Sequence, residues 1–500
     1  MAVTKETLSK EYNIFKGEAF RSSEAGDFQN SLLYIDLCAR IVYTFNFIYI
    51  DDELEDLLAH ISSQLLTKPE FKSEKRFVFY DFFGFDNQGL TQQYIRAMTS
   101  WEVEFLYILE IGDNLSSSKD ILTELASYSK AEVVILKGDR LTKITQAYNA
   151  IVQYKPEKAF LHFAPWDVIG VCVWSQFKNV QRFFINLTDH AFWLGKSCAD
   201  YIIEFRTFGH NLSVKARGFS ANILFIQPYY PIQSESRFLG FDVDVSNKVV
   251  GFSGSAFHKI YGRGGKFLEL IKKALVDNEN FIFLMAGAGY GKPLLDFIKA
   301  NRLEDRFILL GHRNDIDQVI KNIDIFINTY PISGGLMTQL AVLNNKALIS
   351  YTSPDLSVNF VEDFLNVDRE KVFSIKNEKG FSDEINKLIS DKKFRKENAD
   401  LYRNSIPTVD EFNSGLEKIV LNPEKQDHSK VNDITIDLEA DQSVYMEIEN
   451  NFYKQYDFLK LKYLGVKYFK LSPVAALKSI ISSSFYNFEL YKKILKSIFR

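Results

Sequence analysis

Three neighbouring residues with little or no side chain, Ser333, Gly334 and Gly335, stand between the apolar run IDIFINT and the helical pattern GGLMTQLAVL. Glycines let a phosphate approach the backbone, and the first turn of a helix offers unpaired amide hydrogens and a positive dipole end. The order of strand, Gly-Gly turn and helix between Gly311 and Tyr351 therefore predicts a pocket for a nucleoside diphosphate. An isolated Gly-Gly pair also marks ordinary tight turns, so the prediction depends on the surrounding elements.

A second loop carries cations that could serve the same anion. It follows the apolar run VVGFSG, which ends in Ser253 and Gly254, and it contains Lys259 and Arg263 before the helical pattern GGKFLELIKKAL. The family resemblance described below implies that this loop holds a diphosphate, and a lysine or arginine there would balance the charge that develops as the diphosphate departs when no metal ion is present. We expect Lys259 or Arg263 to do so. The alternative is that both are solvated charges on an exposed loop.

A candidate base lies in the first half of the chain, in the stretch INLTDHAFW. His190 follows an apolar run that ends near Asn186, and histidine titrates near neutral pH, as a base for an attacking hydroxyl should. Neighbouring side chains point apart along a chain, so we do not expect Asp189 to orient the His190 ring. A histidine satisfied by backbone groups at the end of a strand is the alternative.

Other charged residues compete for roles near that base. Asp81 and Asp86 lie in DFFGFDNQGL, between the first apolar run and a helical pattern. The family resemblance described below implies that this loop approaches the donor phosphates or the acceptor, which makes the two aspartates rival bases. Arg206 and Arg217 are candidate contacts for an anionic acceptor. Ordinary salt bridges at a sheet edge explain these two arginines equally well.

Composition restricts the class of protein. The 500 residues are 46% hydrophobic and 25% charged, with a formal net charge of −4, which indicates a globular protein of several domains and argues against a nucleic-acid-binding role. The sequence has no apolar run of roughly 20 residues, and MAVTKETLSKEYNIF is too charged for a secretion signal, so we expect a cytoplasmic protein. Cys38, Cys172 and Cys198 have no metal or disulfide spacing and are expected to be buried as small hydrophobic residues.

Hydrophobic patterns divide the chain into four segments. Residues 1–70 show helical periodicity and predict a helical cap, whereas residues 76–231 and 248–405 each alternate short apolar runs with helical patterns. This alternation predicts two α/β domains with parallel sheets, whose ligands bind at the carboxyl ends of the strands. The expected strands are RFVFYDF, EVEFLYILEI, EVVILKG, KAFLHFA, RFFINL, DYIIEF and NILFIQPYY in the first domain, and VVGFSG, FIFLMAG, RFILLGH, IDIFINT, ALISY and KVFSI in the second.

The two predicted halves resemble GT-B nucleotide-sugar glycosyltransferases, in which two doubly wound Rossmann-like domains face each other across a cleft. The resemblance covers roughly Arg76 to Leu401, and GGLMTQLAVLNNKALISY is similar to the corresponding segment of inverting members, among them the O-GlcNAc-transferase-like group and bacterial polysaccharide enzymes. It implies that the second domain binds the donor and the first supplies the acceptor site and the base. It implies neither a metal ion nor a cofactor, and family frequency favours a UDP-sugar.

The resemblance also assigns roles to particular loops. It implies pyrophosphate contacts for the loop after VVGFSG, a nucleotide-base border for the loop after RFILLG, and an acidic contact to the donor sugar after ALISY. We expect Arg313 to stack on the base, whereas Asp315 is better explained as a helix N-cap. The donor set is Ser253, Gly254, Lys259, Arg263, Gly311, His312, Arg313, Ser333, Gly334, Gly335, Thr338 and Asp355, and the acceptor set is Asn186, Asp189, Arg206 and Arg217.

One departure concerns the stereochemistry of transfer. Retaining members carry two glutamates eight residues apart, and the positions that face them here are Pro331 and Gln339. This absence counts against the retaining family's contacts to ribose and sugar. It favours direct displacement with inversion.

The last segment, residues 406–500, is a polar linker followed by a basic tail. From Lys454 to Arg500 the tail has ten basic residues against Asp457 and Glu489, and aromatic and aliphatic residues are interleaved with them. Such a tail could lie on an anionic lipid surface, which would suit a lipid-linked acceptor. The alternative is a set of helices that pack back on the domains and leave their lysines in water.

We therefore expect a glycosyltransferase that moves a sugar from a nucleoside diphosphate to a hydroxyl of a glycan or polyprenyl-linked oligosaccharide. A protein O- or N-glycosyltransferase is an alternative. A non-catalytic GT-B partner that binds a transferase or its glycoprotein is another, and so is a nucleotide-sugar epimerase, because a fold does not fix a function. A dinucleotide oxidoreductase is disfavoured because no GxGxxG follows the first strand of either half.

Overall fold

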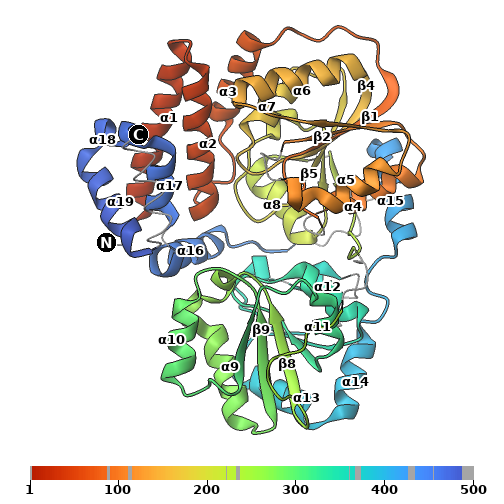
Figure 1. Cartoon of the computed structure of the whole chain (residues 1–500), viewed down its shortest axis with the longest axis vertical. Helices are drawn as coiled ribbons and strands as arrows, with labels where there is room; N and C mark the ends of the chain where they lie inside the picture. The colour runs from red at the N-terminus through yellow and green to blue at the C-terminus, as the bar shows by residue number, and fades with distance from the viewer. Residues whose placement is uncertain are drawn as a thin grey trace.

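Two parallel β-sheets, one in each half of the chain, form the centre of the computed structural model (Figure 1). The structure describes residues 3–86, 90–110, 115–220, 222–231, 237–359, 361–365, 373–425, 434–453 and 455–486. The strands of the first sheet lie between residues 74 and 225 and those of the second between 249 and 375. The sequence prediction of two α/β halves is confirmed.

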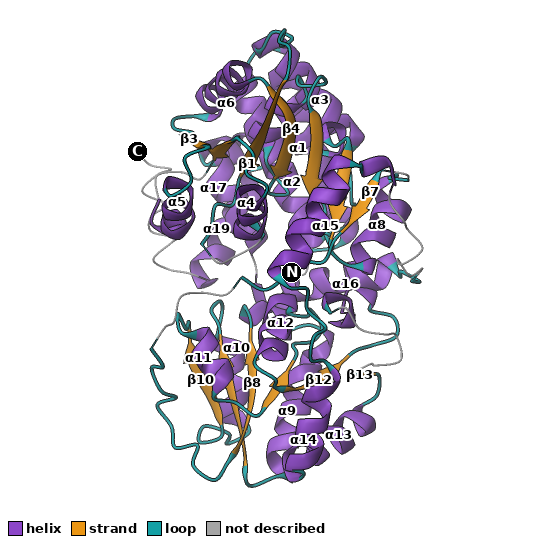
Figure 2. Cartoon of the chain, turned by 90° about the vertical axis from the view of Figure 1, so that its right-hand side faces the viewer, coloured by secondary structure: helices purple, strands orange, loops and turns teal. Residues whose placement is uncertain are grey.

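The first sheet has the strand order β3-β2-β1-β4-β5-β6-β7, and all its pairs are parallel. Its strands are almost continuously apolar because helices cover both faces (Figure 2). All seven predicted runs form strands. They are β1 (Glu74–Asp81), β2 (Phe105–Leu109), β3 (Ala131–Ile135), β4 (Pro156–His162), β5 (Gln181–Ile185), β6 (Tyr201–Glu204) and β7 (Ile223–Phe225), with α4 (Thr91–Ser100), α5 (Lys119–Ala126), α6 (Arg140–Tyr154), α7 (Val168–Trp174) and α8 (Thr207–Arg217) between them.

The second sheet has the strand order β10-β9-β8-β11-β12-β13 and is also parallel. The order reverses beside β8, at the kind of switch point where such sheets bind ligands. Its strands are β8 (Val249–Gly254), β9 (Phe281–Ala286), β10 (Phe307–Gly311), β11 (Ile325–Ile327), β12 (Ala347–Tyr351) and β13 (Ser374–Ile375), with α9 (Lys266–Asp277), α10 (Lys292–Ala300), α11 (Ile316–Lys321), α12 (Gly335–Leu343), α13 (Glu378–Ser390) and α14 (Lys392–Leu401).

The two ends of the chain meet in one helical layer beside the first sheet (Figure 1). The cap consists of α1 (Lys5–Glu24), α2 (Phe28–Phe45) and α3 (Asp52–Leu65), and the tail of α16 (Leu438–Ile448), a π-helical turn at Glu449–Tyr453, α17 (Gln455–Leu464), α18 (Val466–Leu471) and α19 (Pro473–Tyr486). Tyr456, Leu461, Leu464 and Tyr468 share one apolar core with the cap. The described part of the tail therefore packs back on the protein, while Lys492, Lys493, Lys496 and Arg500 lie outside the described residues.

Helix α15 (Val409–Leu421) leaves the second domain and packs on α4 of the first. A capping box at Thr408 and Glu411 starts it, and its apolar face enters the core with Phe412 and Leu416. The indole Nε1 of Trp101 donates to the carbonyl of Asn413 at 3.0 Å. The segment after residue 405 thus begins with a helix of the first domain, although the sequence predicted only a linker there.

The buried position of Leu461 gives a test of the tail packing. Leu461 is 1% exposed against the cap, whereas Leu477 on α19 is 56% exposed. Leu461→Ala should lower the free energy of unfolding by about 2–5 kcal/mol through the cavity it leaves, and Leu477→Ala should change it by less than about 0.5 kcal/mol. Urea denaturation of both variants measures this, and equal values for the two would show that the tail does not pack on the cap in solution.

Candidate functional site

A cleft of about 1130 Å³ lies between the carboxyl ends of the two sheets. Its walls come from the loops after β5 and β6 of the first domain and after β8, β9, β10 and β11 of the second, together with residues of α2 and α16. Eleven of the residues predicted from the sequence line it: Asp86, Asp189, His190, Arg206, Gly254, Lys259, His312, Arg313, Ser333, Gly334 and Gly335.

The Gly-Gly turn at the start of α12 is fixed by a side chain that the sequence analysis missed. Asn328, at the end of β11, accepts hydrogen bonds from the amide of Thr329 at 2.8 Å and from that of Gly334 at 2.9 Å, and it donates to Thr338 Oγ1 at 2.7 Å. The Gly334 amide is therefore occupied within the protein. Among the described residues, none accepts a hydrogen bond from the amides of Gly335, Leu336 and Met337, which open α12 and line the cleft.

Lys259 is the cation beside this turn. Its Nζ donates to the carbonyl of Ser333 at 3.2 Å, which holds the ammonium group next to the Gly-Gly segment. Burial, with the nearby charge of Arg206, lowers the pKa of Lys259 to about 8. The neighbouring His258 also lines the cleft, and burial, with the charges of Lys259 and His190, lowers its pKa to about 4.

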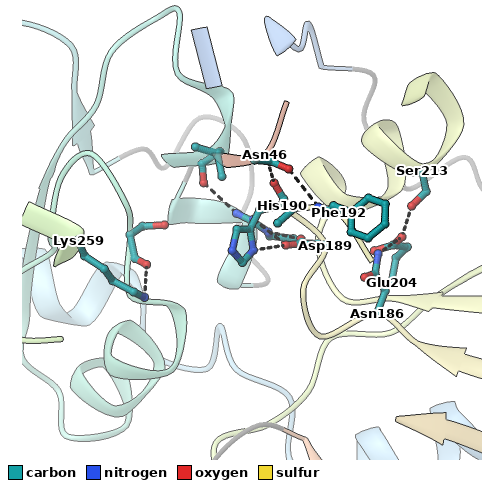
Figure 3. A network of polar contacts seen from close by, with 12 residues as sticks. Asn46, Asn186, Asp189, His190, Phe192, Glu204, Ser213 and Lys259 are labelled. Carbon is teal, nitrogen blue, oxygen red and sulfur yellow. Dashed lines mark hydrogen bonds and ion pairs between the residues drawn. The ribbon is translucent and has the colours of Figure 1, made fainter. Parts of the chain in front are cut away.

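His190, on the loop after β5, lines the same cleft as the Gly-Gly turn, and Figure 3 shows it together with Lys259 of the second domain. Its Nδ1 is 3.4 Å from Asp189 Oδ1, so the expectation that Asp189 could not orient the ring is wrong. The loop turns sharply enough after β5 for the two neighbours to meet. This contact favours the tautomer with its proton on Nδ1, and no residue in the described ranges is hydrogen-bonded to Nε2. Burial lowers the pKa of His190 more than Asp189 raises it, which keeps the ring neutral.

Arg206 holds the Asp189 carboxylate in place. The guanidinium group donates to both carboxylate oxygens of Asp189, and its Nη1 donates to the carbonyl of Val358 in the second domain at 3.0 Å. Burial alone would raise the pKa of Asp189, but Arg206 and His190 lower it to about 2. The guanidinium group also lies 4.6 Å from the ring centre of Phe208 and 5.0 Å from that of Phe364. Arg206 therefore positions the loop and joins the domains.

Two further residues hold the backbone of the same loop. Arg217 is fully buried and donates to the carbonyls of Asp189 and Ala191, at 2.8 and 2.7 Å. Asn46, which ends α2 in the left-handed conformation, donates to the His190 carbonyl and accepts from the Phe192 amide, both at 3.0 Å (Figure 3). Arg217 is thus a structural clamp and not part of the cleft wall. An asparagine after a helical pattern is a common left-handed cap, which is the one sequence signal that Asn46 carries.

Glu204 is a buried carboxyl group behind Asp189 that the sequence analysis did not identify. Its Oε1 accepts hydrogen bonds from Asn186 Nδ2 and Ser213 Oγ (Figure 3), while Oε2 is buried and has no partner among the residues that the structure describes. Burial and the charge of Asp189 raise the pKa of Glu204 to about 7. Asn186 is therefore committed to Glu204 and does not reach the cleft.

Several other predicted site residues lie outside the cleft lining. Asp81 is fully buried and accepts from Tyr107 and Thr91 near His162, so it cannot reach an acceptor. Ser253 donates to the Ile327 carbonyl and so joins β8 to β11. Thr338 donates to the Gly334 carbonyl and so stabilises the Gly-Gly turn. The Gly311 carbonyl accepts from the Gly287 amide.

Arg263 and Asp355 pair with each other at 3.1 Å, outside the cleft lining. The amides of Arg263 and Gly264 donate to Glu447 of α16, which ties the loop to the tail. Of the two cations predicted for the diphosphate, only Lys259 lines the cleft.

Two of the lining residues, Arg313 and Asp86, have their polar groups engaged. Arg313 donates to both oxygens of Asp315 and to the carbonyl of Gly240, so its guanidinium group is held by protein partners. Asp315 begins α11 but does not cap it, because its carboxylate binds Arg313 and the Leu239 amide. Asp86 accepts from the amides of Asp120 and Ile121 and so anchors α5. His312 lines the cleft beside Arg313.

Gln339 occupies one of the positions where retaining enzymes carry a glutamate. Its Nε2 donates to the carbonyls of Pro228 and Phe364, at 2.9 and 3.2 Å, and its buried Oε1 has no partner in the described structure. Pro331 follows Tyr330 in a cis peptide bond. The cleft is also lined by Tyr43 and Thr44 of α2 and by Tyr445, Ile448 and Glu449 of the tail, none of which the sequence singled out.

In the described ranges, no group of three His, Cys, Asp or Glu side chains is arranged to hold a metal ion. None of the described helices combines the length and apolar character needed to cross a membrane. Cys38, Cys172 and Cys198 are buried free thiols, as predicted.

No protein-family model and no curated protein sequence matches the chain. Solved structures do resemble it. HepE from Anabaena, in complex with UDP-glucose, is 15% identical with a TM-score of 0.52 over 70% of this chain and 100% of that one. TarM from S. aureus, in a complex that contains UDP, is 9% identical with a TM-score of 0.51 over 71% and 100%. The O-GlcNAc transferase of Thermobaculum terrenum is 11% identical with a TM-score of 0.50 over 87% and 85%. The chain has the GT-B fold.

The buried Glu204 predicts a specific dependence of stability on pH. The pKa of Glu204 rises from 4.5 to about 7 on folding. Its contribution to the free energy of unfolding is therefore fully present below pH 4.5 and is lost as the pH rises through 7. Glu204→Gln, which imitates the neutral acid, should stabilise the protein at pH 8 by up to about 3 kcal/mol and have little effect at pH 4.5. Denaturant unfolding at both pH values measures this. The exposed Glu132→Gln is the control, and an equal effect of Glu204→Gln at both pH values would contradict the assignment.

Proposed function

We propose that the protein is a glycosyltransferase that moves a sugar from UDP to a hydroxyl group of a glycan, with inversion at the anomeric carbon. The observation that carries this proposal is the position of His190 across one cleft from Lys259 and the Gly-Gly turn. A base and a diphosphate site that face each other leave room for the reacting sugar between them. The binding of UDP or UDP-glucose by HepE, which shares the fold, supports the choice of nucleotide.

The donor diphosphate would bind at the start of α12. The amides of Gly335, Leu336 and Met337 point from the first turn of the helix, and Lys259 supplies the positive charge. On the other side of the turn, Gly254 leaves the backbone open to the diphosphate. A Cβ at this position would lie only 2.9 Å from Met337 Cε, so the site is narrow enough to favour glycine. Gln339 lines the cleft beside this turn, with its Oε1 buried and without a partner in the described structure.

Transfer would proceed in one displacement. His190 Nε2 takes the proton of the acceptor hydroxyl, the acceptor oxygen bonds to the anomeric carbon, and the bond from that carbon to the phosphate oxygen breaks. The electron pair leaves with UDP, and Lys259 balances the new charge. The lowered pKa of His190 keeps Nε2 unprotonated at neutral pH, as a base requires. Attack opposite the leaving group inverts the anomeric centre.

Two substitutions separate the roles of base and donor site. His190→Ala should lower kcat by roughly 10²–10⁴-fold while UDP binding is kept, because only the proton acceptor is lost. Lys259→Ala should weaken UDP binding by about 10–100-fold, and the exposed Lys292→Ala is its control. Calorimetry with UDP and assays of UDP release from UDP-sugars measure both effects, and the anomeric proton of the product reports inversion.

The same assays test the alternatives. A wild-type protein that binds UDP but releases none from any UDP-sugar and glycan acceptor would be a non-catalytic partner. A His190→Ala variant with full kcat would remove His190 as the base. A product that keeps the donor configuration would contradict direct displacement.

A membrane-facing surface is the second part of the proposal. Val474, Leu477 and Ile481 are 65%, 56% and 53% exposed on one face of α19, while Ala476 and Ser479 are buried on the other. Lys470 and Lys478 are exposed beside them. An apolar stripe with flanking cations complements an anionic bilayer, and a peripheral position would bring the cleft to a lipid-linked glycan.

Vesicle flotation tests this surface. The triple change Val474→Ser, Leu477→Ser and Ile481→Ser should abolish flotation with vesicles of phosphatidylcholine and phosphatidylglycerol, because the inserted apolar area is lost. Val276→Ser with Leu295→Ser is the matched control, since these side chains are 64% and 56% exposed on α9 and α10. Equal flotation of the triple variant and wild type would contradict the proposal. The proposal would also be contradicted if the wild-type protein were a dimer and the triple change made it a monomer, because the apolar stripe would then be an interface between two copies of the chain.

A further inference from the structure

We infer that the helices at the two ends of the chain form a binding wall for a sugar ring of the acceptor. This inference rests on the proposed function and deepens it. The wall is made by Tyr43 and Thr44 at the end of α2 and by Tyr445, Ile448 and Glu449 at the end of α16. The acceptor set predicted from the sequence lies elsewhere, because Asn186 and Arg217 do not reach the cleft and Arg206 is bound to Asp189.

The wall is next to the proposed base. The Tyr445 ring lies nearly parallel to the His190 imidazole, with ring centres 6.2 Å apart and planes inclined by 13°. A group held against Tyr445 is therefore beside the His190 ring. The Tyr43 ring, on the same lining, is supported by an edge contact with Trp166 at 5.2 Å.

The wall is also fixed in place relative to the base. Asn46, two residues beyond Thr44, binds the His190 carbonyl and the Phe192 amide, so α2 and the base loop move together. On the tail side, the π-helical turn Glu449–Tyr453 interrupts the helix at the cleft, and Glu449 Oε1 accepts from the Tyr456 amide at 2.7 Å. Such π-helical turns are costly in ordinary helices and recur at functional sites.

The chemistry of these five side chains selects a neutral sugar. Two aromatic rings offer apolar faces for the C–H face of a pyranose, and the Thr44 hydroxyl is a hydrogen-bonding group for a sugar hydroxyl. The Glu449 carboxylate is buried and accepts from the Tyr456 amide, so it shapes the wall from within. None of the five is a cation. The positive charges of the lining, Lys259, Arg206 and Arg313, belong to the diphosphate site or are paired with Asp189 and Asp315, so the wall itself offers nothing for an anionic group.

Binding of p-nitrophenyl β-D-glucopyranoside in the presence of UDP tests the wall without need for turnover. Saturation-transfer NMR of the full chain should give a dissociation constant about tenfold higher for Tyr43→Leu and Tyr445→Ala, because the aromatic face is lost. Tyr445→Phe should keep glycoside binding, since the ring remains. Tyr148→Ala, on α6 away from the cleft, is the control.

UDP affinity distinguishes failure of the wall from failure of the proposed function. Calorimetry should show an unchanged UDP dissociation constant in every variant, which also confirms that each is folded. Unchanged glycoside binding in Tyr43→Leu and Tyr445→Ala would overturn the inference. So would a Ser/Thr peptide that binds to wild type, is lost in these variants and displaces the glycoside. A wild type that binds the glycoside but not UDP would contradict the donor proposal and leave the wall supported.

Discussion

The buried ion pair between Arg206 and Asp189 is the interaction on which the arrangement of the cleft depends. Both side chains are at most 3% exposed, so two charges have been taken out of water. Such a pair is tolerated when the geometry is good and the remaining donors are satisfied, and removal of one partner typically costs about 3–5 kcal/mol. Here the carboxylate receives two guanidinium N–H groups, and a third reaches the carbonyl of Val358. One pair thus orients His190 and joins the two domains.

Val358 extends this junction to the end of the chain. Its carbonyl accepts from Arg206, and its amide donates to Asp441 of α16, which also accepts from Ser357 Oγ. The His190 loop, the second domain and the tail therefore meet at one residue. The helices outside the two Rossmann-like halves are part of the cleft architecture, because they bind at this junction and at Asn46.

The sequence predicted the strands and the identity of the two halves, but few of the side-chain contacts. Buried parallel strands are apolar on both faces, so each run could be recognised locally, and the topology then placed the loops after β5, β8 and β11 at one cleft. Whether a polar residue in these loops faces the cleft depends on partners far away in the chain. Asp81 binds Tyr107, Arg263 binds Glu447 and Arg217 binds the Asp189 carbonyl. No local sequence pattern encodes these contacts, because the partners are far apart in the chain.

The contact between the two domains restricts which side chain fits at position 339, where the chain has a glutamine. Its Nε2 donates to two carbonyls, those of Pro228 at the end of the first domain and Phe364 in the second. A carboxylate at this position would face both carbonyls with no hydrogen to donate, so the glutamate of retaining enzymes cannot be accommodated by the same contacts. The amide satisfies both carbonyls, and its Oε1 is buried without a partner in the described structure. The absence of a glutamate at position 339 is therefore explained by the way these two domains are joined.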